Sequence, residues 1–280
     1  MLHIIEDSVM DSVKLLPFLF LAYLAMEYLE HRTGKGIQRW IGKADKASPV
    51  IGGLLGIVPQ CGFSAAAANL YAGRVITLGT LMAIFLSASD EMLPILLSER
   101  APLDTILEIL LVKAILGMIA GIAIDWIRRR MRKESSGSIH DICEREHCHC
   151  ERGIFLSALT HTFQIALFLL LITFFLNLLL YFTGEDMLAV LLSDKPVLGP
   201  ILAGLVGLIP NCAGSVVITK LYLEGMLSMG AAMAGLLAGS GVGILVLFRV
   251  NRNRKENLKI LGLLYGIGVG AGILMELFPG

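Results

Sequence analysis

Two sets of cysteine residues could do chemistry in this 280-residue chain. The first belongs to a dense tract that reads HDICEREHCHCE over residues 140–151. Its candidate metal ligands are His140, Cys143, His147, Cys148, His149 and Cys150. Thiolate and imidazole groups bind zinc and other soft metals, and four of them close a tetrahedral site. Because the spacing is not that of a zinc finger, we expect a metal-capturing sensor or delivery loop, the alternative being a solvated linker with incidental metal affinity.

The second set is a pair of cysteines, each two residues after a proline inside an apolar segment. The two segments supply the candidate substrate ligands Pro59, Gln60, Cys61, Ser64, Pro210, Asn211, Cys212 and Ser215. Two thiols that face each other would suit a soft, thiophilic metal or metalloid. A single cysteine in such a segment is more often a small hydrophobic residue, in which case the two amide side chains could bind a small organic solute.

Three of the charged side chains that lie inside the apolar runs need an explanation. An acid inside a spanning segment is costly and usually functional, so Asp90 is predicted to couple transport to a proton or another cation. Glu91 points about 100° away on a helix, and it is either a second coupling group or reaches the outer interface. Lys113 either pairs with an acid or snorkels to the surface, and snorkelling is favoured. Tyr71 and Tyr222 are predicted to be interfacial anchors.

The composition places the chain in a membrane. Hydrophobic residues make up 56% of it and charged residues 16%, whereas a soluble domain is about a quarter charged. The 23 Lys and Arg residues balance the 23 Asp and Glu residues, which removes the electrostatic case for a nucleic-acid partner. Neither a phosphate-binding loop nor a His-Glu-x-x-His motif occurs, so we expect no enzyme activity and no required cofactor.

An internal duplication organises the sequence. Residues 49–126 align without a gap on residues 200–277, at an offset of 151. The matched pairs include Gly56/Gly207, Pro59/Pro210, Cys61/Cys212, Ser64/Ser215, Tyr71/Tyr222, Gly79/Gly230, Ser89/Ser240, Gly117/Gly268 and Gly121/Gly272. Shared Pro, Cys and Tyr residues rarely arise by chance in apolar sequence. We therefore predict a first transmembrane repeat over 1–127, a cytoplasmic loop over 128–152 and a second repeat over 153–280.

Charge placement predicts the orientation of the two repeats. Spanning helices are expected over 15–29, 76–97, 105–127, 158–182, 227–248 and 258–278. The basic loops are 31–48, 128–133 and 249–259, and such loops collect on the cytoplasmic side. All three reach that side only if 50–72 and 201–223 enter the membrane and return, although a proline-kinked span remains an alternative. Residues 50–58 would make about 14 Å of helix, which is about half of a 30 Å hydrocarbon core.

The predicted fold is therefore an all-α, polytopic membrane protein of two inverted repeats. Each repeat has three spanning helices plus one re-entrant hairpin, in which the helix breaks at the proline. We expect a multi-pass protein of the inner membrane, with the 128–152 loop in the cytoplasm and both termini outside. Broken helices that meet near the midplane recur in secondary transporters, where they hold the substrate.

The chain also resembles the prokaryotic ten-span heavy-metal exporter family, whose members are labelled arsenic efflux proteins or manganese transporters. The resemblance rests on the duplicated Pro-x-Cys segments and on the loop ending in His147, Cys148, His149 and Cys150. Ten spans agree with the prediction if each hairpin counts as two. The resemblance implies export of a metal or metalloid. Paired thiols suit arsenic(III) better than Mn²⁺, which prefers carboxylate and carbonyl oxygens.

The predicted function is a secondary transporter that exports a heavy metal or metalloid by alternating access, with the hairpin tips at the midplane. Its partners would be the lipid bilayer, the metal or metalloid substrate and a coupling ion, for which H⁺ is the candidate. Two alternatives remain open. One is a permease for a small organic solute, and the other is a metal-sensing membrane scaffold whose working part is the 140–151 tract.

Overall fold

All regular structure in the described part of the protein is helical. This computed structural model describes residues 48–57, 61–89, 92–131, 197–210 and 212–277, together with single positions within 17–24 and 159–171. The spans predicted over 15–29 and 158–182 therefore lie almost wholly outside the described residues, as does the 31–48 loop up to its last residue.

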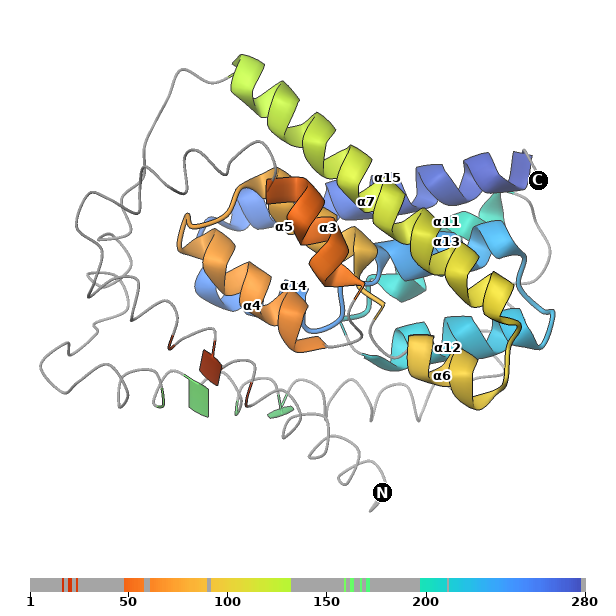
Figure 1. Ribbon diagram of the computed structural model, residues 1–280. Coiled ribbons are helices and arrows are strands. Elements are labelled where there is room, and N and C mark those ends of the chain that lie inside the picture. The colour runs from red at the N-terminus through yellow and green to blue at the C-terminus, as the bar shows by residue number, and fades with distance from the viewer. Residues whose placement is uncertain are drawn as a thin grey trace, which may run out of the picture.

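The helices of the described ranges fall into two series of five (Figure 1). The first series is α3 (Ser48–Gly56), α4 (Cys61–Ala72), α5 (Leu78–Ser87), α6 (Met92–Ser98) and α7 (Leu103–Met131). The second is α11 (Leu198–Gly207), α12 (Cys212–Leu223), α13 (Met229–Ala238), α14 (Gly243–Val250) and α15 (Arg254–Leu277). The last four helices of each series begin 151 residues apart, so the offset read from the sequence recurs in the helix boundaries.

The protein is a polytopic membrane protein. Within the described ranges, four segments are long and apolar enough to cross a bilayer, namely Leu78–Ser98, Leu103–Arg130, Met229–Val250 and Arg254–Leu277. Along α7, large apolar side chains that recur every four residues are exposed, including Leu103, Leu107, Leu111, Ile115 and Ile119. A stripe of this kind on a soluble protein would be a large exposed apolar patch, whereas in a bilayer it is the face in contact with lipid.

Two of the predicted spans are interrupted in the middle. In the 76–97 run, α5 ends at Ser87 and α6 begins at Met92; in the 227–248 run, α13 ends at Ala238 and α14 begins at Gly243. Neither interruption contains a proline. In the second, Gly241 adopts a φ of +52°, a conformation that favours glycine because it has no Cβ. The two runs therefore remain candidate spans, as expected, but the helix within each is interrupted.

Within each series the middle helix is the centre of the packing. Helix α5 packs between α3 and α7, and α13 packs in the same way between α11 and α15. The backbones touch at paired glycines, because a Cβ at Gly79 would overlap Gly121 O and one at Gly230 would lie 2.5 Å from Gly272 O. Between the series, α4 packs on α14 and α12 packs on α6. Helices α4 and α12 thus each lie against the short helix of the other series.

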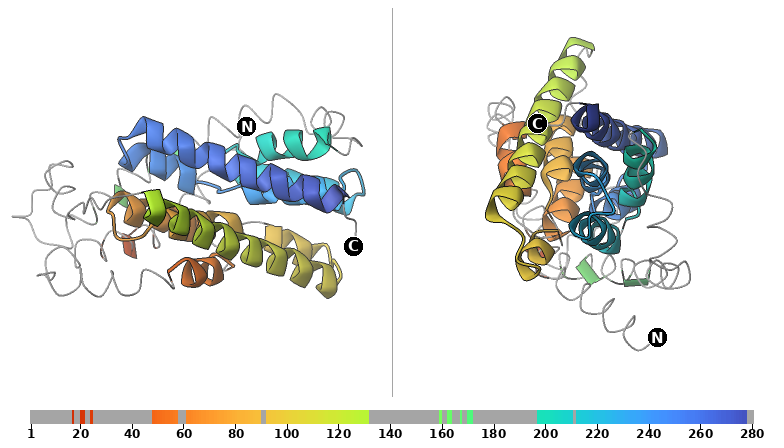
Figure 2. Two further views of the ribbon diagram at one scale, coloured as in Figure 1. Left: turned by 90° about the horizontal axis from the view of Figure 1, so that it is seen from above. Right: turned by 90° about the vertical axis from the view of Figure 1, so that its right-hand side faces the viewer.

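Matched polar contacts join α5 to α7 and α13 to α15. Thr77 caps α5 and donates from Oγ1 to Asp125 Oδ2 at 2.5 Å, while Ser228 caps α13 and donates to Glu276 Oε1. Both pairs again differ by 151 positions. Helices α7 and α15 run in opposite directions along the bundle (Figure 2). The Thr77–Asp125 and Ser228–Glu276 contacts therefore lie toward opposite ends of it.

The start of α3 lies at the end of the bundle where α7 finishes. Ser48 Oγ accepts a hydrogen bond from Thr80 Oγ1 at 2.9 Å. Thr80 belongs to the first turn of α5, and its own N–H donates to Thr77 Oγ1. Because Thr77 binds Asp125, near the C-terminal end of α7, these contacts place Ser48 at that end.

The chain leaves α4 at the same end of the bundle. Arg74, two residues after α4, lies 3.4 Å from Glu256 Oε2, and Arg128 of α7 lies 3.1 Å from Glu256 Oε1. Glu256 belongs to the first turn of α15. The chain therefore enters α3 and leaves α4 at the end of the bundle where α7 finishes and α15 starts.

Candidate substrate site at the helix breaks

In the described part of the chain, four helix breaks begin inside the bundle, after Gly56, Ser87, Gly207 and Ala238. Backbone N–H and C=O groups freed at such breaks persist in a membrane only inside protein or around a water-filled cavity. One hydrogen bond joins the first two breaks, since Ser89 Oγ donates to Ile57 O at 2.6 Å. The end of α3 and the end of α5 therefore form one polar junction.

The first turn of α4 reaches a break of the other series. A Cβ added at Gly243, the first residue of α14, would lie 2.8 Å from Ser64 Cβ and 3.0 Å from Phe85 Cε1. Ser64 is 1% exposed. In the second series, α11 ends against the last turn of α13, because a Cβ at Gly207 would overlap Gly235 O. The ends of the short helices thus converge inside the bundle.

A buried lysine lies among these helix ends. Lys113 of α7 is 1% exposed, and its Nζ donates to Leu236 O of α13 at 2.8 Å. The expectation that Lys113 snorkels to the surface was wrong, because its stem runs into the bundle and a carbonyl of the other series binds its ammonium. The sequence signal was a charge inside an apolar run without a counterpart in the second repeat, where Leu264 occupies the equivalent position.

The predicted thiols begin the two returning helices. Cys61 is the first residue of α4 and Cys212 the first residue of α12. Their side chains, and all of Pro59, Gln60 and Asn211, lie outside the described residues. Of the other candidate ligands, Ser64 is buried, Pro210 and Ser215 are half-buried, and Ser215 O accepts from Thr219 Oγ1 at 2.7 Å. That the two sulfur atoms face each other therefore stays a prediction.

The predicted coupling residues and the predicted metal ligands lie outside the described residues. Asp90 and Glu91 follow α5 and lie outside the described residues, as does the whole metal-ligand set His140, Cys143, His147, Cys148, His149 and Cys150. Among the residues that the structure does describe, no three His, Cys, Asp or Glu side chains form a group that could hold a metal ion.

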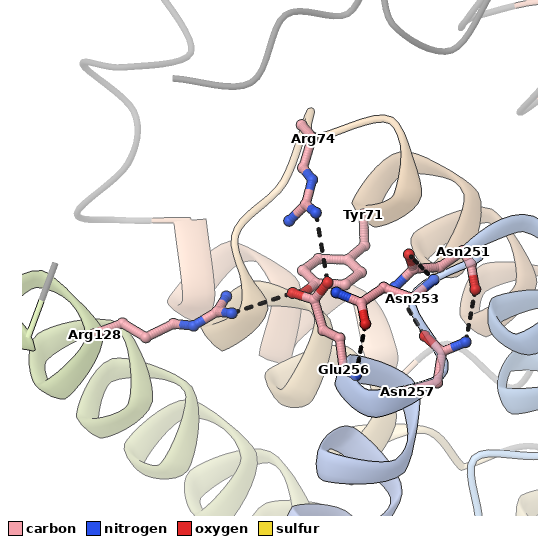
Figure 3. Close-up of polar contacts among 7 residues, drawn as sticks. All are labelled: Tyr71, Arg74, Arg128, Asn251, Asn253, Glu256 and Asn257. Carbon is pink, nitrogen blue, oxygen red and sulfur yellow. Dashed lines mark hydrogen bonds and ion pairs between the residues drawn. The ribbon is translucent and has the colours of Figure 1, made fainter. Parts of the chain in front are cut away.

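A polar cluster that the sequence did not predict joins the two series at one end of the bundle (Figure 3). Glu256 accepts hydrogen bonds from Tyr71 Oη at 2.5 Å and from Arg128 Nη2 at 3.1 Å, and it also binds Arg74. Tyr71 is 2% exposed. It is therefore a buried hydrogen-bond donor, and the expectation that it is an interfacial anchor was wrong.

The turn before α15 positions the carboxylate of this cluster. Asn251 Nδ2 donates to Asn257 Oδ1 at 2.8 Å, and Asn257 Nδ2 donates back to Asn251 O at 2.7 Å. Asn253 Oδ1 accepts from the N–H of Glu256 at 3.3 Å, which is a side-chain cap on the first turn of the helix. These bonds hold Glu256 where α4 and α7 end (Figure 3).

Comparisons with known proteins give one family. The sequence model of a family described as "Putative, 10TM heavy-metal exporter" matches residues 1–183 and 151–279. No curated protein and no solved structure matches the chain.

Proposed function

Because this chain belongs to the ten-transmembrane heavy-metal exporter family, we propose that it exports a thiophilic metal or metalloid as a secondary transporter working by alternating access. Membership of this family identifies the protein as a membrane exporter. The substrate, the mechanism and the coupling ion are our proposals, and they rest on the helix breaks inside the bundle.

The observation that carries the mechanism is the contact between Gly243 and Ser64. It brings the first turn of a hairpin helix in one series against the broken helix of the other. Secondary transporters bind substrate where discontinuous helices from two repeats meet, because freed carbonyls and N–H groups there can coordinate it. We therefore propose that Cys61, Cys212 and the neighbouring amides of Gln60 and Asn211 hold the substrate.

We propose further that the two series are inverted repeats with re-entrant hairpins. The opposite directions of α7 and α15 support inversion, as do the matched Thr77–Asp125 and Ser228–Glu276 contacts toward opposite ends of the bundle. Entry into α3 and exit from α4 at one end supports re-entry of the first hairpin. In this arrangement the 128–152 loop is cytoplasmic, in line with its basic start, and both termini lie outside in the inner membrane.

Alternating access requires a contact that closes one end of the pathway. The cluster around Glu256 joins α4, α7 and α15 at the end where the basic 128–152 loop begins. We propose that this cluster closes the cytoplasmic end. The 140–151 tract, with its thiol and imidazole groups, would capture metal on that side and deliver it when the cluster opens.

The substrate assignment is tested by uptake into everted inner-membrane vesicles with an imposed pH gradient. We expect arsenite to accumulate and Mn²⁺ to accumulate less, because paired thiols prefer soft metals and metalloids. Replacing both Cys61 and Cys212 by serine should abolish arsenite uptake. The matched control replaces Cys143, Cys148 and Cys150 by serine, and it should leave most of the uptake intact.

Two results would redirect the proposal. Full arsenite uptake by the Cys61→Ser/Cys212→Ser variant would mean that the thiols are packing residues, and a small organic solute would become the candidate substrate. Complete loss of function on deleting residues 140–151, with the membrane part still folded, would favour a metal-sensing scaffold. A transporter should keep most of its flux after that deletion.

A further inference from the structure

Lys113 connects the two series at a place that attracts cations. Its Nζ donates to Leu236 O at 2.8 Å, and Leu236 lies in the last turn of α13, which ends at Ala238. The last four carbonyls of a helix lack intrahelical partners, and together they carry a partial negative charge. The ammonium of Lys113 therefore occupies the position at which a broken helix would otherwise bind a free cation.

Packing alone does not require a lysine at this position. The equivalent residue of α15 is Leu264, which is 0% exposed, so an apolar side chain fills the same place in the second series. One turn further along, the packing is matched in the two series. A Cβ at Gly117 would lie 2.8 Å from Ala83 O, and one at Gly268 would lie 3.0 Å from Ala234 O. Because a buried charge costs free energy that leucine does not, the lysine points to a function.

The described surroundings of Lys113 hold few other titratable groups. The helices packed against it, α3, α5 and α13, contain no acidic, basic, His, Cys or Tyr side chain between their bounds. The acids on α7 itself are Asp104 and Glu108, which are exposed, and Asp125, which binds Thr77 and the N–H of Gly79. Asp90 and Glu91, which follow α5, lie outside the described residues.

We propose that Lys113 is the coupling residue of the transport cycle, a tethered cation whose proton is exchanged for the substrate. This inference rests on the proposed function. In the protonated form the ammonium binds the carbonyl end of α13 and joins the two series. Loss of one proton from Nζ to a water molecule leaves a neutral amine, which frees that helix end to move. Uptake of one proton from water on the other side restores the contact.

The test compares Lys113→Arg with Lys113→Met in reconstituted vesicles, with arsenite as the substrate. Arginine keeps the charge and can donate to Leu236 O, but it does not release a proton at working pH. We expect Lys113→Arg to fold and to exchange arsenite across the membrane when no pH gradient is imposed. Its arsenite uptake should no longer respond to a pH gradient. Lys113→Met should also lose the response. Wild-type uptake should depend on the pH gradient and not on Na⁺ or K⁺.

The control is the same pair of substitutions at Lys220, an exposed lysine of α12, which should leave the gradient response unchanged. A Lys113→Arg variant that responds to the gradient like the wild type would overturn the inference, because a purely structural lysine tolerates arginine. Should Lys113→Met fail to give a monodisperse protein, Lys113→Arg alone decides. A wild type that moves neither arsenite nor Mn²⁺ would instead sink the proposed function, and the inference with it.

Discussion

Arg128 and Glu256 join the two series of helices across the end of the bundle, with Nη2 and Oε1 3.1 Å apart. Arg128 lies in the last turn of α7, and Glu256 lies in the first turn of α15. The same carboxylate accepts a hydrogen bond from the hydroxyl of Tyr71, on α4. One side chain of α15 therefore binds both α4 and α7.

Replacing Glu256 by alanine should open this end of the protein. The change removes two ion pairs and leaves the buried Tyr71 hydroxyl without its acceptor, at a cost of about 1–3 kcal/mol for the unsatisfied group. We expect faster labelling of Val75→Cys by a membrane-impermeant maleimide in everted vesicles, in a background whose native cysteines are serine. Glu276→Ala, at the other end of the bundle, is the matched control. Equal labelling of the two variants would contradict a closing role for Glu256.

Ser89 should matter more for transport than for folding. Its hydroxyl joins the end of α5 to Ile57 O at 2.6 Å, so Ser89→Ala leaves that carbonyl without this donor at the junction of two breaks. We predict a clear loss of arsenite uptake with a destabilisation of about 1 kcal/mol. Ser98→Ala is the control, because Ser98 makes a similar bond to Ile95 O on the exposed end of α6. Unchanged arsenite uptake by Ser89→Ala would show that the junction between Ser89 and Ile57 is not part of the transport pathway.

The glycine contact between α13 and α15 should tolerate no side chain. A Cβ at Gly230 would lie 2.5 Å from Gly272 O, so Gly230→Ala must push two helix backbones apart. Overpacking of this kind costs about 1–3 kcal/mol, which thermal unfolding in detergent would report as a lower midpoint. Gly262→Ala on α15 meets nothing within 4 Å and should be neutral or slightly stabilising. A Gly230→Ala protein as stable as the wild type would show that the helices do not approach this closely.

Residues on either side of the first hairpin should be accessible from one face of the membrane. Ser48 and Arg74 both lie at the end of the bundle where α7 finishes, and a crossing helix would separate them by about 30 Å. We expect Asp45→Cys and Arg74→Cys, each in a cysteine-free background, to react with an impermeant reagent only from the cytoplasmic side. Reaction from opposite sides would rule out re-entry and, with it, the inverted arrangement.

Several features could be predicted without tertiary structure because they depend on composition and order along the chain. The apolar runs identify a membrane protein, and the offset of 151 recurs in the starts of α4 and α12. Pro59 and Pro210 marked two of the four breaks, since proline removes a backbone donor. The breaks after Ser87 and Ala238 were missed because no proline marks them. Polar or glycine residues there, such as Ser89 and Gly241, were the available signal.

The amino-acid sequence by itself determined the membrane class and the offset of 151 that recurs in the helix boundaries, because hydropathy and spacing are properties of the chain. The roles of the candidate cysteine, histidine and acidic residues stay predictions. Only the tertiary structure decided which residues meet. Lys113 and Leu236 are 123 positions apart, and Tyr71 and Glu256 are 185 apart. No local pattern encodes such contacts, since they arise when the two helix series pack together and must satisfy every polar group that they bury.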